Sequence, residues 1–272
     1  MIKKLLVLLL LCSSAFGQWQ SGIKPTLGRQ INWGHPLSRG LVGCWLMNEG
    51  SGNIVNDLSG NGHTGSLVAD THFVAGKFGP ALSFDGTGDY VNVPIQLNTG
   101  SYTWSFWSYT NTVQQMWFMS GDTLTSGWGI GCWDATGVFR VYSGSDSNRW
   151  VSAAGVVQAG VWQHFCVVYN GSIMSNVYLN GISLTPASNN STTPITSATA
   201  MRIAGRPGTV WVELLGKIDN VMIYNRALSA QEISQLYIDP FGMFKPAFDL
   251  YLIGGIVIPG ISGGQVIMIG EF

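Results

Sequence analysis

The feature that most constrains the fold is a series of short apolar runs, each closed by a turn, that fills most of the chain. The runs 116–120, 128–133, 138–142 and 150–153 follow at intervals of about 8 to 12 residues, with Gly, Asp, Ser or Asn between them. The 272 residues include 36 glycines, are 46% hydrophobic and only 10% charged, so the chain can bury a large core while turning often. These observations predict an all-β fold in one large domain.

Two segments indicate how the strands are layered. In 101–109 the rings of Tyr102, Trp104 and Phe106 alternate with hydroxyl side chains and Trp107, so each set shares one face of a strand. The run Leu41–Met47 is apolar apart from one glycine, which is typical of a strand covered on both faces. The pattern therefore predicts that Leu41–Met47 is a strand covered on both faces, and that the strand over 101–109 packs one face while its other face carries polar groups and one ring.

Local signals also define a hairpin and a helix. Asn180-Gly181 lies between two β-rich runs and favours the positive φ angles of a tight primed turn. Ser229 followed by Glu232 forms a capping-box pattern at the start of an amphipathic segment. We expect a hairpin at the first position and a short helix over 229–236 at the second.

Three longer stretches carry a family resemblance. Gly40–Gly52 contains an apolar Trp strand that ends in Asn-Glu-Gly-Ser-Gly. Asp57–Gly86 holds Asp-Leu-Ser-Gly-Asn-Gly-His and Gly-Lys-Phe-Gly-Pro-Ala-Leu-Ser-Phe-Asp-Gly, and Gly216–Ile233 holds Ile-Asp-Asn-Val-Met-Ile-Tyr-Asn-Arg-Ala-Leu-Ser. Together they resemble the laminin-G-like, concanavalin A-like jelly-roll family. The resemblance implies a two-sheet antiparallel jelly-roll sandwich with one short C-terminal helix, over residues 40–240.

The same resemblance implies a structural calcium ion. Matching positions in that family commonly help to hold calcium and join the first turn to the closing strand. By resemblance the ligands are Asp57, Asn61, the carbonyl of His63 and Asp219, with Asp85 as a weaker candidate. The alternative is that Asp57 caps its turn and Asp219 accepts hydrogen bonds at a strand end.

The eleven tryptophans divide by context. Those in strongly apolar runs, Trp45, Trp104 and Trp162, are expected in the core. Others lie near loops beside small or polar residues, where rings can stack on sugars and amides or carboxylates can bond hydroxyls. This set predicts a glycan-binding rim made of Trp117, Trp128, Trp133, Trp150, Asp134 and Asn148. Edge-strand packing is the alternative for the same rings.

Several function classes are not favoured. A formal net charge of -1 offers no basic field for nucleic acid. The paired carboxylates of jelly-roll glycoside hydrolases, written Glu-x-Asp-x-x-Glu, are missing from the sequence, and its four histidines show no metal-ligand spacing. No catalytic residues are assigned, and enzymatic activity is not expected.

The two ends of the chain differ from its middle. Residues 1–17 have two lysines, an apolar core and a small-x-small site, which predicts a secretory signal peptide and export to the cell surface or medium. An uncleaved anchor and a lipoprotein signal at Cys12 are alternatives. Residues 18–39 are interpreted as an N-terminal arm, and the apolar, glycine-rich residues 241–272 as a tail. For this tail extra strands or self-association are favoured over a membrane segment or disorder.

Taken together, the sequence predicts a non-catalytic exported recognition module. Its expected partner is a glycan or a surface glycoprotein, and a structural calcium is expected to stabilise it. The alternative is a structural or adhesion subunit of a cell surface or virus particle, assembled through the tail. The remaining cysteines, Cys44, Cys132 and Cys166, lie in apolar segments and are expected as buried thiols without an assigned pairing.

Overall fold

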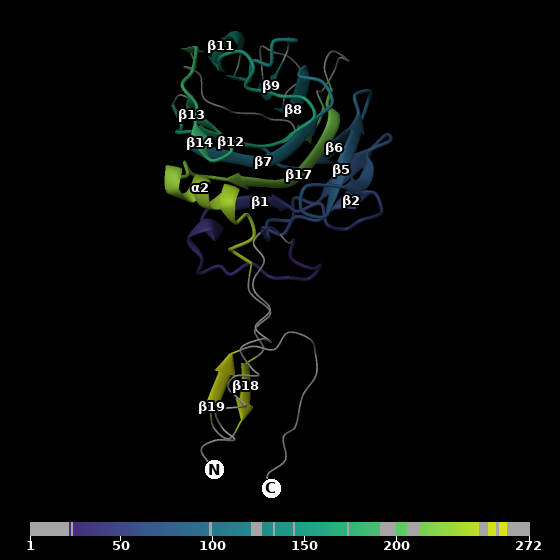
Figure 1. Ribbon diagram of the computed structural model, residues 1–272, viewed down its shortest axis with the longest axis vertical. Helices are drawn as coiled ribbons and strands as arrows, with labels where there is room; N and C mark the ends of the chain where they lie inside the picture. The colour runs from purple at the N-terminus through teal and green to yellow at the C-terminus, as the bar shows by residue number, and fades with distance from the viewer. Residues whose placement is uncertain are drawn as a thin grey trace.

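The structure is a computed structural model that describes residues 22, 24–97, 100–120, 127–132, 134–143, 145–172, 174–190, 200–205, 213–244, 250–253 and 256–259. Two antiparallel sheets form a sandwich (Figure 1). The first sheet has the order β14-β13-β12-β7-β17-β5-β4, and β1 also pairs with β17. The second has the order β15-β11-β10-β9-β8-β16-β6-β3-β2. The all-β, two-sheet jelly-roll prediction is confirmed.

The strands of the first sheet are β1 (Leu41–Trp45), β4 (His72–Ala75), β5 (Pro80–Asp85), β7 (Tyr102–Thr110), β12 (Trp162–Tyr169), β13 (Met174–Leu179), β14 (Ile182–Ser183) and β17 (Leu215–Tyr224). Those of the second are β2 (Ile54–Val55), β3 (Gly65–Val68), β6 (Tyr90–Val93), β8 (Gln115–Ser120), β9 (Trp128–Cys132), β10 (Arg140–Ser143), β11 (Ser145–Val151), β15 (Ser188–Asn189) and β16 (Met201–Ile203).

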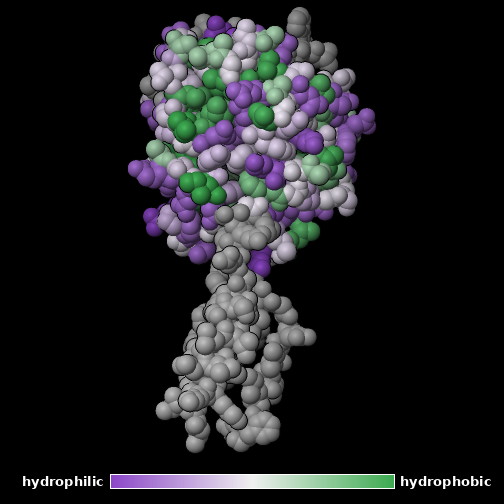
Figure 2. All heavy atoms as spheres, viewed as in Figure 1, coloured by the Kyte–Doolittle hydropathy of each residue, from purple (hydrophilic) through white to green (hydrophobic). Residues whose placement is uncertain are grey.

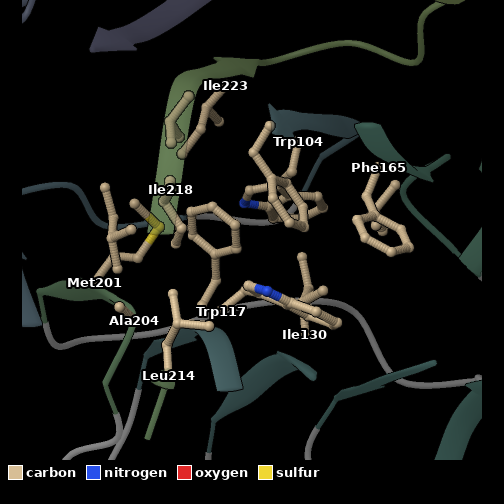
Figure 3. Close-up of a cluster of buried hydrophobic side chains, with 14 of the residues drawn as sticks. Trp104, Trp117, Ile130, Phe165, Met201, Ala204, Leu214, Ile218 and Ile223 are labelled. Carbon is tan, nitrogen blue, oxygen red and sulfur yellow. The ribbon is translucent and has the colours of Figure 1, made fainter. Parts of the chain in front are cut away.

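Strand β7 shows why the first sheet lies between two apolar layers. Tyr102, Trp104 and Phe106 belong to the cluster between the sheets, as the alternation predicts. Trp107 points to the opposite side, where its ring meets Phe78 and Tyr237. Figure 3 shows the inner cluster, with rings and aliphatic side chains from both sheets packed around Trp104 and Trp117.

A second apolar layer covers part of the outer face of the first sheet. Helix α2 (Ala230–Ile238) and β1 lie under β17, β7 and β12 in Figure 1. Ser229 caps the helix and Glu232 completes the capping box, as predicted. Buried side chains of this layer are Ile31, Leu37, Leu41, Cys44, Leu46, Cys166, Val168, Tyr178, Met222, Tyr224, Leu228, Ile233, Leu236, Phe241, Met243 and Phe244.

The N-terminal segment takes part in this layer over its described residues. It contains a short 3-10 helix, η1 (Pro36–Ser38), and Ile31 forms a β-bridge with Phe244. Leu37 is fully buried. The described part of 18–39 therefore lies against the sandwich instead of extending from it as an arm, whereas residues 1–17 and Trp19 lie outside the described part.

Turns and thiols follow the sequence signals. Asn180 and Gly181 have φ angles of 51° and 79° and join β13 to β14, which confirms the predicted hairpin. Cys44, Cys132 and Cys166 are buried free thiols in the structure. Burial raises the pKa of Cys132 to about 11 and the pKa values of the other two further, so these thiols are unreactive at neutral pH.

The C-terminal region adds one more hairpin. β18 (Leu250–Ile253) pairs antiparallel with β19 (Ile256–Pro259) in a separate two-stranded sheet. This confirms the expectation of extra strands for these residues, while 260–272 lie outside the described part. Within that part, none of the helices has the length and apolar character needed to cross a membrane.

The surface of the sandwich is chemically mixed. In the view of Figure 2, apolar residues are scattered among polar ones over the described part of the domain. The side chains that could form a binding site must therefore be found by their arrangement on particular strands.

Candidate functional site

The turn after Asp57 is held by that residue's own carboxylate. Oδ1 accepts hydrogen bonds from the backbone N–H groups of Cys44 (3.0 Å) and Ser59 (2.9 Å). Oδ2 accepts from the Ser59 hydroxyl (2.8 Å) and the backbone N–H of His63 (2.9 Å). The side chain is completely buried. Asp57 thus holds its own turn through three donors and ties it to strand β1 through a fourth, the Cys44 N–H.

The other two expected ligands of this turn are also engaged. The carbonyl of His63 accepts a hydrogen bond from the Trp45 indole at 2.8 Å. The Asn61 amide nitrogen donates to the Ser59 hydroxyl at 3.0 Å and lies 3.4 Å from the Val42 carbonyl. The His63 carbonyl thus faces an N–H donor, and the Asn61 amide contributes donors to the turn.

Asp219 lies elsewhere, at an irregular point of β17. The first half of β17 pairs with β5 and the second half with β1, and the register shifts between Asp219 and Met222. The Asp219 carboxylate is fully buried and its Oδ2 accepts from the backbone N–H groups of Lys77 (3.2 Å) and Phe78 (3.3 Å). Its Oδ1 forms an ion pair with the ammonium of Lys24.

The four residues expected to bind calcium therefore do not form one site. Asp57 and Asp219 share no hydrogen-bond partner, and a hard cation needs several converging oxygen ligands. Within the described residues no group of three or more His, Cys, Asp or Glu side chains could hold a metal ion. This donor set does not fit calcium, because N–H groups and an ammonium already occupy its carboxylates. The weaker candidate, Asp85, is exposed and accepts from the backbone N–H of Thr87 in its own turn.

The tryptophans expected at a glycan-binding rim are in the core. Trp117, Trp128 and Trp150 are each 0% exposed. Trp117 lies beside Ile130 and Leu214 in Figure 3, and its indole donates to the Ser108 hydroxyl at 2.8 Å. A ring that is packed on both faces cannot stack on a sugar, so the prediction of a glycan-binding rim is wrong for these three tryptophans. Their rings are fully buried in the core and do not pack at a strand edge.

The remaining members of that rim are placed only in part. Trp133 and the side chain of Asn148 lie outside the described residues, and only the backbone of Asn148 is described, in β11. Asp134 is partly exposed, forms an ion pair with Arg140 and accepts a hydrogen bond from the backbone N–H of Thr136 at 3.0 Å. The Thr136 and Arg140 hydrogen bonds lower the pKa of Asp134 against the opposing effect of desolvation, which is the largest single influence.

A different set of side chains forms a candidate site on the outer face of the first sheet. Residues directly opposite one another on five neighbouring strands form what we call the outer-face row: Trp162, Tyr109, Lys217, Ser83 and His72. All five are partly or fully exposed. Their chain neighbours Ile218, Leu82 and Phe73 point inward to the core, so alternation directs the row outward.

The aromatic end of this row is well defined. The rings of Tyr109 and Trp162 have their centroids 5.8 Å apart at an angle of 56°. Lys217 Nζ lies 5.6 Å from the Tyr109 ring and 3.4 Å from the carbonyl of Ala75. An open hollow of about 520 Å³ adjoins this carbonyl and is lined by Gly50, Phe73, Val74, Ala75, Gly76, Gly79 and Pro80.

Cationic groups border the row without acidic partners. Neither Lys217 nor Lys77 forms an ion pair among the residues the structure describes. Lys77 Nζ lies 5.0 Å from the ring of Trp107, which stacks on Tyr237 at 5.6 Å. The row thus combines two aromatic rings, a hydroxyl, an imidazole and the ammonium of Lys217 on one sheet.

The sequence offered a weak signal for this row. Trp162 was expected in the core because its run is apolar, and that expectation is wrong: it is the only residue of β12 that is not buried. Tyr109 is likewise the only residue of β7 that is not buried. Trp162 is the first residue of β12 and follows the exposed Val161, and Tyr109 is the penultimate residue of β7. This position near a strand end separates them from the core tryptophans.

Several solved structures share this fold. The binding domain of Paraclostridial Mosquitocidal Protein 1 superposes with a TM-score of 0.61 at 17% identity, covering 76% of this chain and 53% of that one. Domain 4 of AbnA, an extracellular arabinanase from Geobacillus stearothermophilus solved with arabinotriose, gives a TM-score of 0.58 at 16% identity over 72% of this chain and 98% of that domain. A sialidase of Trypanosoma rangeli gives 0.58 at 17% identity over 75% and 33%.

These similarities establish the fold, and the chain spans about half the length of the mosquitocidal binding domain. No curated protein sequence matches the chain. The family model described as the concanavalin A-like lectin/glucanases superfamily matches residues 85–234, which is more than half of the chain. The chain therefore belongs to the concanavalin A-like lectin/glucanases superfamily.

Proposed function

We propose that the chain is a non-catalytic carbohydrate-binding module that acts through the outer-face row. The observation that carries this proposal is the pair of partly exposed rings, Tyr109 and Trp162, on strands whose other residues are buried. An exposed ring fixed by a sheet can cover the apolar face of a sugar at little cost in side-chain entropy.

Polar groups along the row supply the complementary hydrogen bonds. The hydroxyl of Ser83 and the imidazole of His72 lie on the strands beyond Lys217, in line with the two rings. Sugar hydroxyls both donate and accept, so such groups can orient a ring that is held by stacking. The ammonium groups of Lys217 and Lys77 would also accommodate an acidic sugar.

The likeness to domain 4 of AbnA supports the carbohydrate class. That domain is one domain of an extracellular arabinanase, was solved with arabinotriose, and is matched over 98% of its length. The ligand of the present chain is proposed from its own surface, because the 16% identity carries only the fold. The leader-like residues 1–17 favour an exported module, which would meet glycans outside the cell.

A glycan array tests this function. The wild-type chain should bind a defined group of neutral or acidic oligosaccharides, and Trp162→Ala or Tyr109→Ala should weaken binding about ten-fold. Trp33→Ala is the matched control, because Trp33 is 54% exposed but lies outside the row. Binding that is lost in the control and kept in the two row variants would contradict the proposal, as would release of a cleaved product.

A second candidate function, assembly through the tail, is favoured by the β18–β19 hairpin. Its strands bond only to each other in the described structure, and an isolated two-stranded sheet is marginal in water. Pairing with the same hairpin of another copy would satisfy its edges.

Light scattering of the full chain and of a chain ending at Phe244 tests this second function. Oligomers that form only in the full chain would support a structural or adhesion role. Ending at Phe244 keeps the buried Phe241, Met243 and Phe244.

A further inference from the structure

Lys24 occupies a position that is unusual for a lysine. Its side chain is 5% exposed, and its ammonium contacts both the Asp219 carboxylate and the carbonyl of Pro80. The carboxylate of Glu49 lies close enough to act on the same charge. The ammonium thus contacts oxygens of β17 and β5, and the charge of Glu49 acts on it from a third segment of the chain.

We infer that the Lys24 ammonium is a built-in cation that takes the place of a divalent metal ion at Asp219. These oxygens are of the kind that hard cations prefer, namely carboxylates and a backbone carbonyl. Glu49 Oε2 is buried and has no hydrogen-bond partner among the described residues, while its Oε1 accepts from the backbone N–H of Asn56 at 2.8 Å. Replacing the ammonium by an apolar group would leave this oxygen cluster open to calcium.

The backbone around the site explains why a cation is needed there. Along one edge of β17, the pairing with β5 stops at Ile218 and the pairing with β1 starts at Val221. Asp219 lies between these two paired segments. The loop 76–79 closes over the carboxylate through the N–H groups of Lys77 and Phe78. A Cβ at Gly76 would lie 3.0 Å from Asp219 Oδ2 and 2.3 Å from the Ala81 methyl, so the loop approaches as closely as it can. The ammonium joins the N-terminal segment, this loop and β17.

Electrostatics makes the partner indispensable. Burial lowers the pKa of Lys24 and raises the pKa of Asp219, and each charge opposes the shift of the other. A buried carboxylate without a counter-charge is strongly destabilising. The fold therefore depends on some cation at this point, and in this chain the N-terminal segment supplies it.

Thermal unfolding of four proteins tests the inference. The wild-type Tm should be the same with 5 mM calcium and with a chelator. Lys24→Met keeps the apolar stem and should lower Tm by about 10 °C in chelator. Calcium should restore at least half of that loss. The double variant Lys24→Met with Asp219→Asn should show no response to calcium. Lys217→Met, which removes a lysine without an acidic partner, should leave Tm within about 2 °C of wild type.

Three results would overturn the inference. The first is a wild-type Tm that rises with calcium and falls with chelator, because the ammonium would then not fill the site. The second is a Lys24→Met Tm equal to that of wild type, because the carboxylate would then need no cation. The third is a Lys24→Met loss that calcium does not repair, because the oxygens would then not form a cation site. The wild-type comparison remains decisive even if a variant fails to fold.

Discussion

At the scale of single residues, polar side chains fix the turns more than their sequence pattern reveals. The sequence Asp57-Leu-Ser-Gly-Asn-Gly-His63 predicted a tight polar turn that follows an acidic residue, and the turn is present. Its partners could not be read from the sequence, because Asp57 also accepts from Cys44 on strand β1. The alternative that Asp57 caps its turn describes the structure better than a metal ligand does.

Asp57→Ala should therefore destabilise the protein by about 3 kcal/mol or more, because four donors lose a buried charged acceptor. Urea unfolding measures this loss. Asp85→Ala, at an exposed turn aspartate that accepts from Thr87, is the control and should cost less than about 1 kcal/mol. Equal losses of unfolding free energy in the two variants would mean that the hydrogen bonds of Asp57 stabilise the fold no more than those of an exposed turn aspartate.

His164 should make stability depend on pH. Burial lowers the pKa of this fully buried histidine from 6.5 to about 3, and its Nδ1 has no hydrogen-bond partner among the residues that the structure describes. Between these two pH values the unfolded chain binds a proton that the folded chain does not, so stability falls as pH falls below about 6.5.

Urea unfolding at several pH values between 7.5 and 4 measures this dependence. The His164→Gln variant should have a slope shallower than wild type by about 1.4 kcal/mol per pH unit in this window. His72→Gln is the control, since His72 is exposed. Identical slopes for wild type and His164→Gln would exclude His164 as the cause.

At the scale of elements, alternation and capping were predictable and exposure at strand ends was not. The faces of β7 and the capping box of α2 follow from local spacing, which needs no knowledge of neighbours. The exposure of Trp162 and the burial of Trp117, Trp128 and Trp150 depend on which strands pair and how long each partner is. Proximity to a loop in the sequence therefore did not distinguish surface rings from core rings.

Helix α2 offers a test of the outer apolar layer. Leu236 is 1% exposed and packs in that layer, whereas Ile238 is 67% exposed at the helix end. Leu236→Ala should lower the free energy of unfolding by about 2 to 4 kcal/mol, and Ile238→Ala by less than about 0.5 kcal/mol. Urea unfolding of both variants checks the difference; comparable losses would mean that the helix does not cover the sheet in solution.

At the scale of the whole molecule, the spacing of the turns predicted the all-β fold, and the three motif-bearing stretches indicated the family. The linkage between the ends of the chain did not follow, because Lys24 and Asp219 meet only after β17 has paired with β5 and β1. A calcium clasp was expected by resemblance, and a lysine stands at the buried carboxylate of Asp219. The outer-face row likewise arises from five strands that pair side by side although most of them are far apart in the sequence.

The position of a bound oligosaccharide tests the central claim most directly. A crystal structure of the protein with the strongest array ligand should place a sugar ring over Tyr109 and Trp162, with a polar contact to Lys217 or Ser83. A sugar bound away from the outer-face row, for example at Trp33 or beside Asp134, would contradict the proposed site.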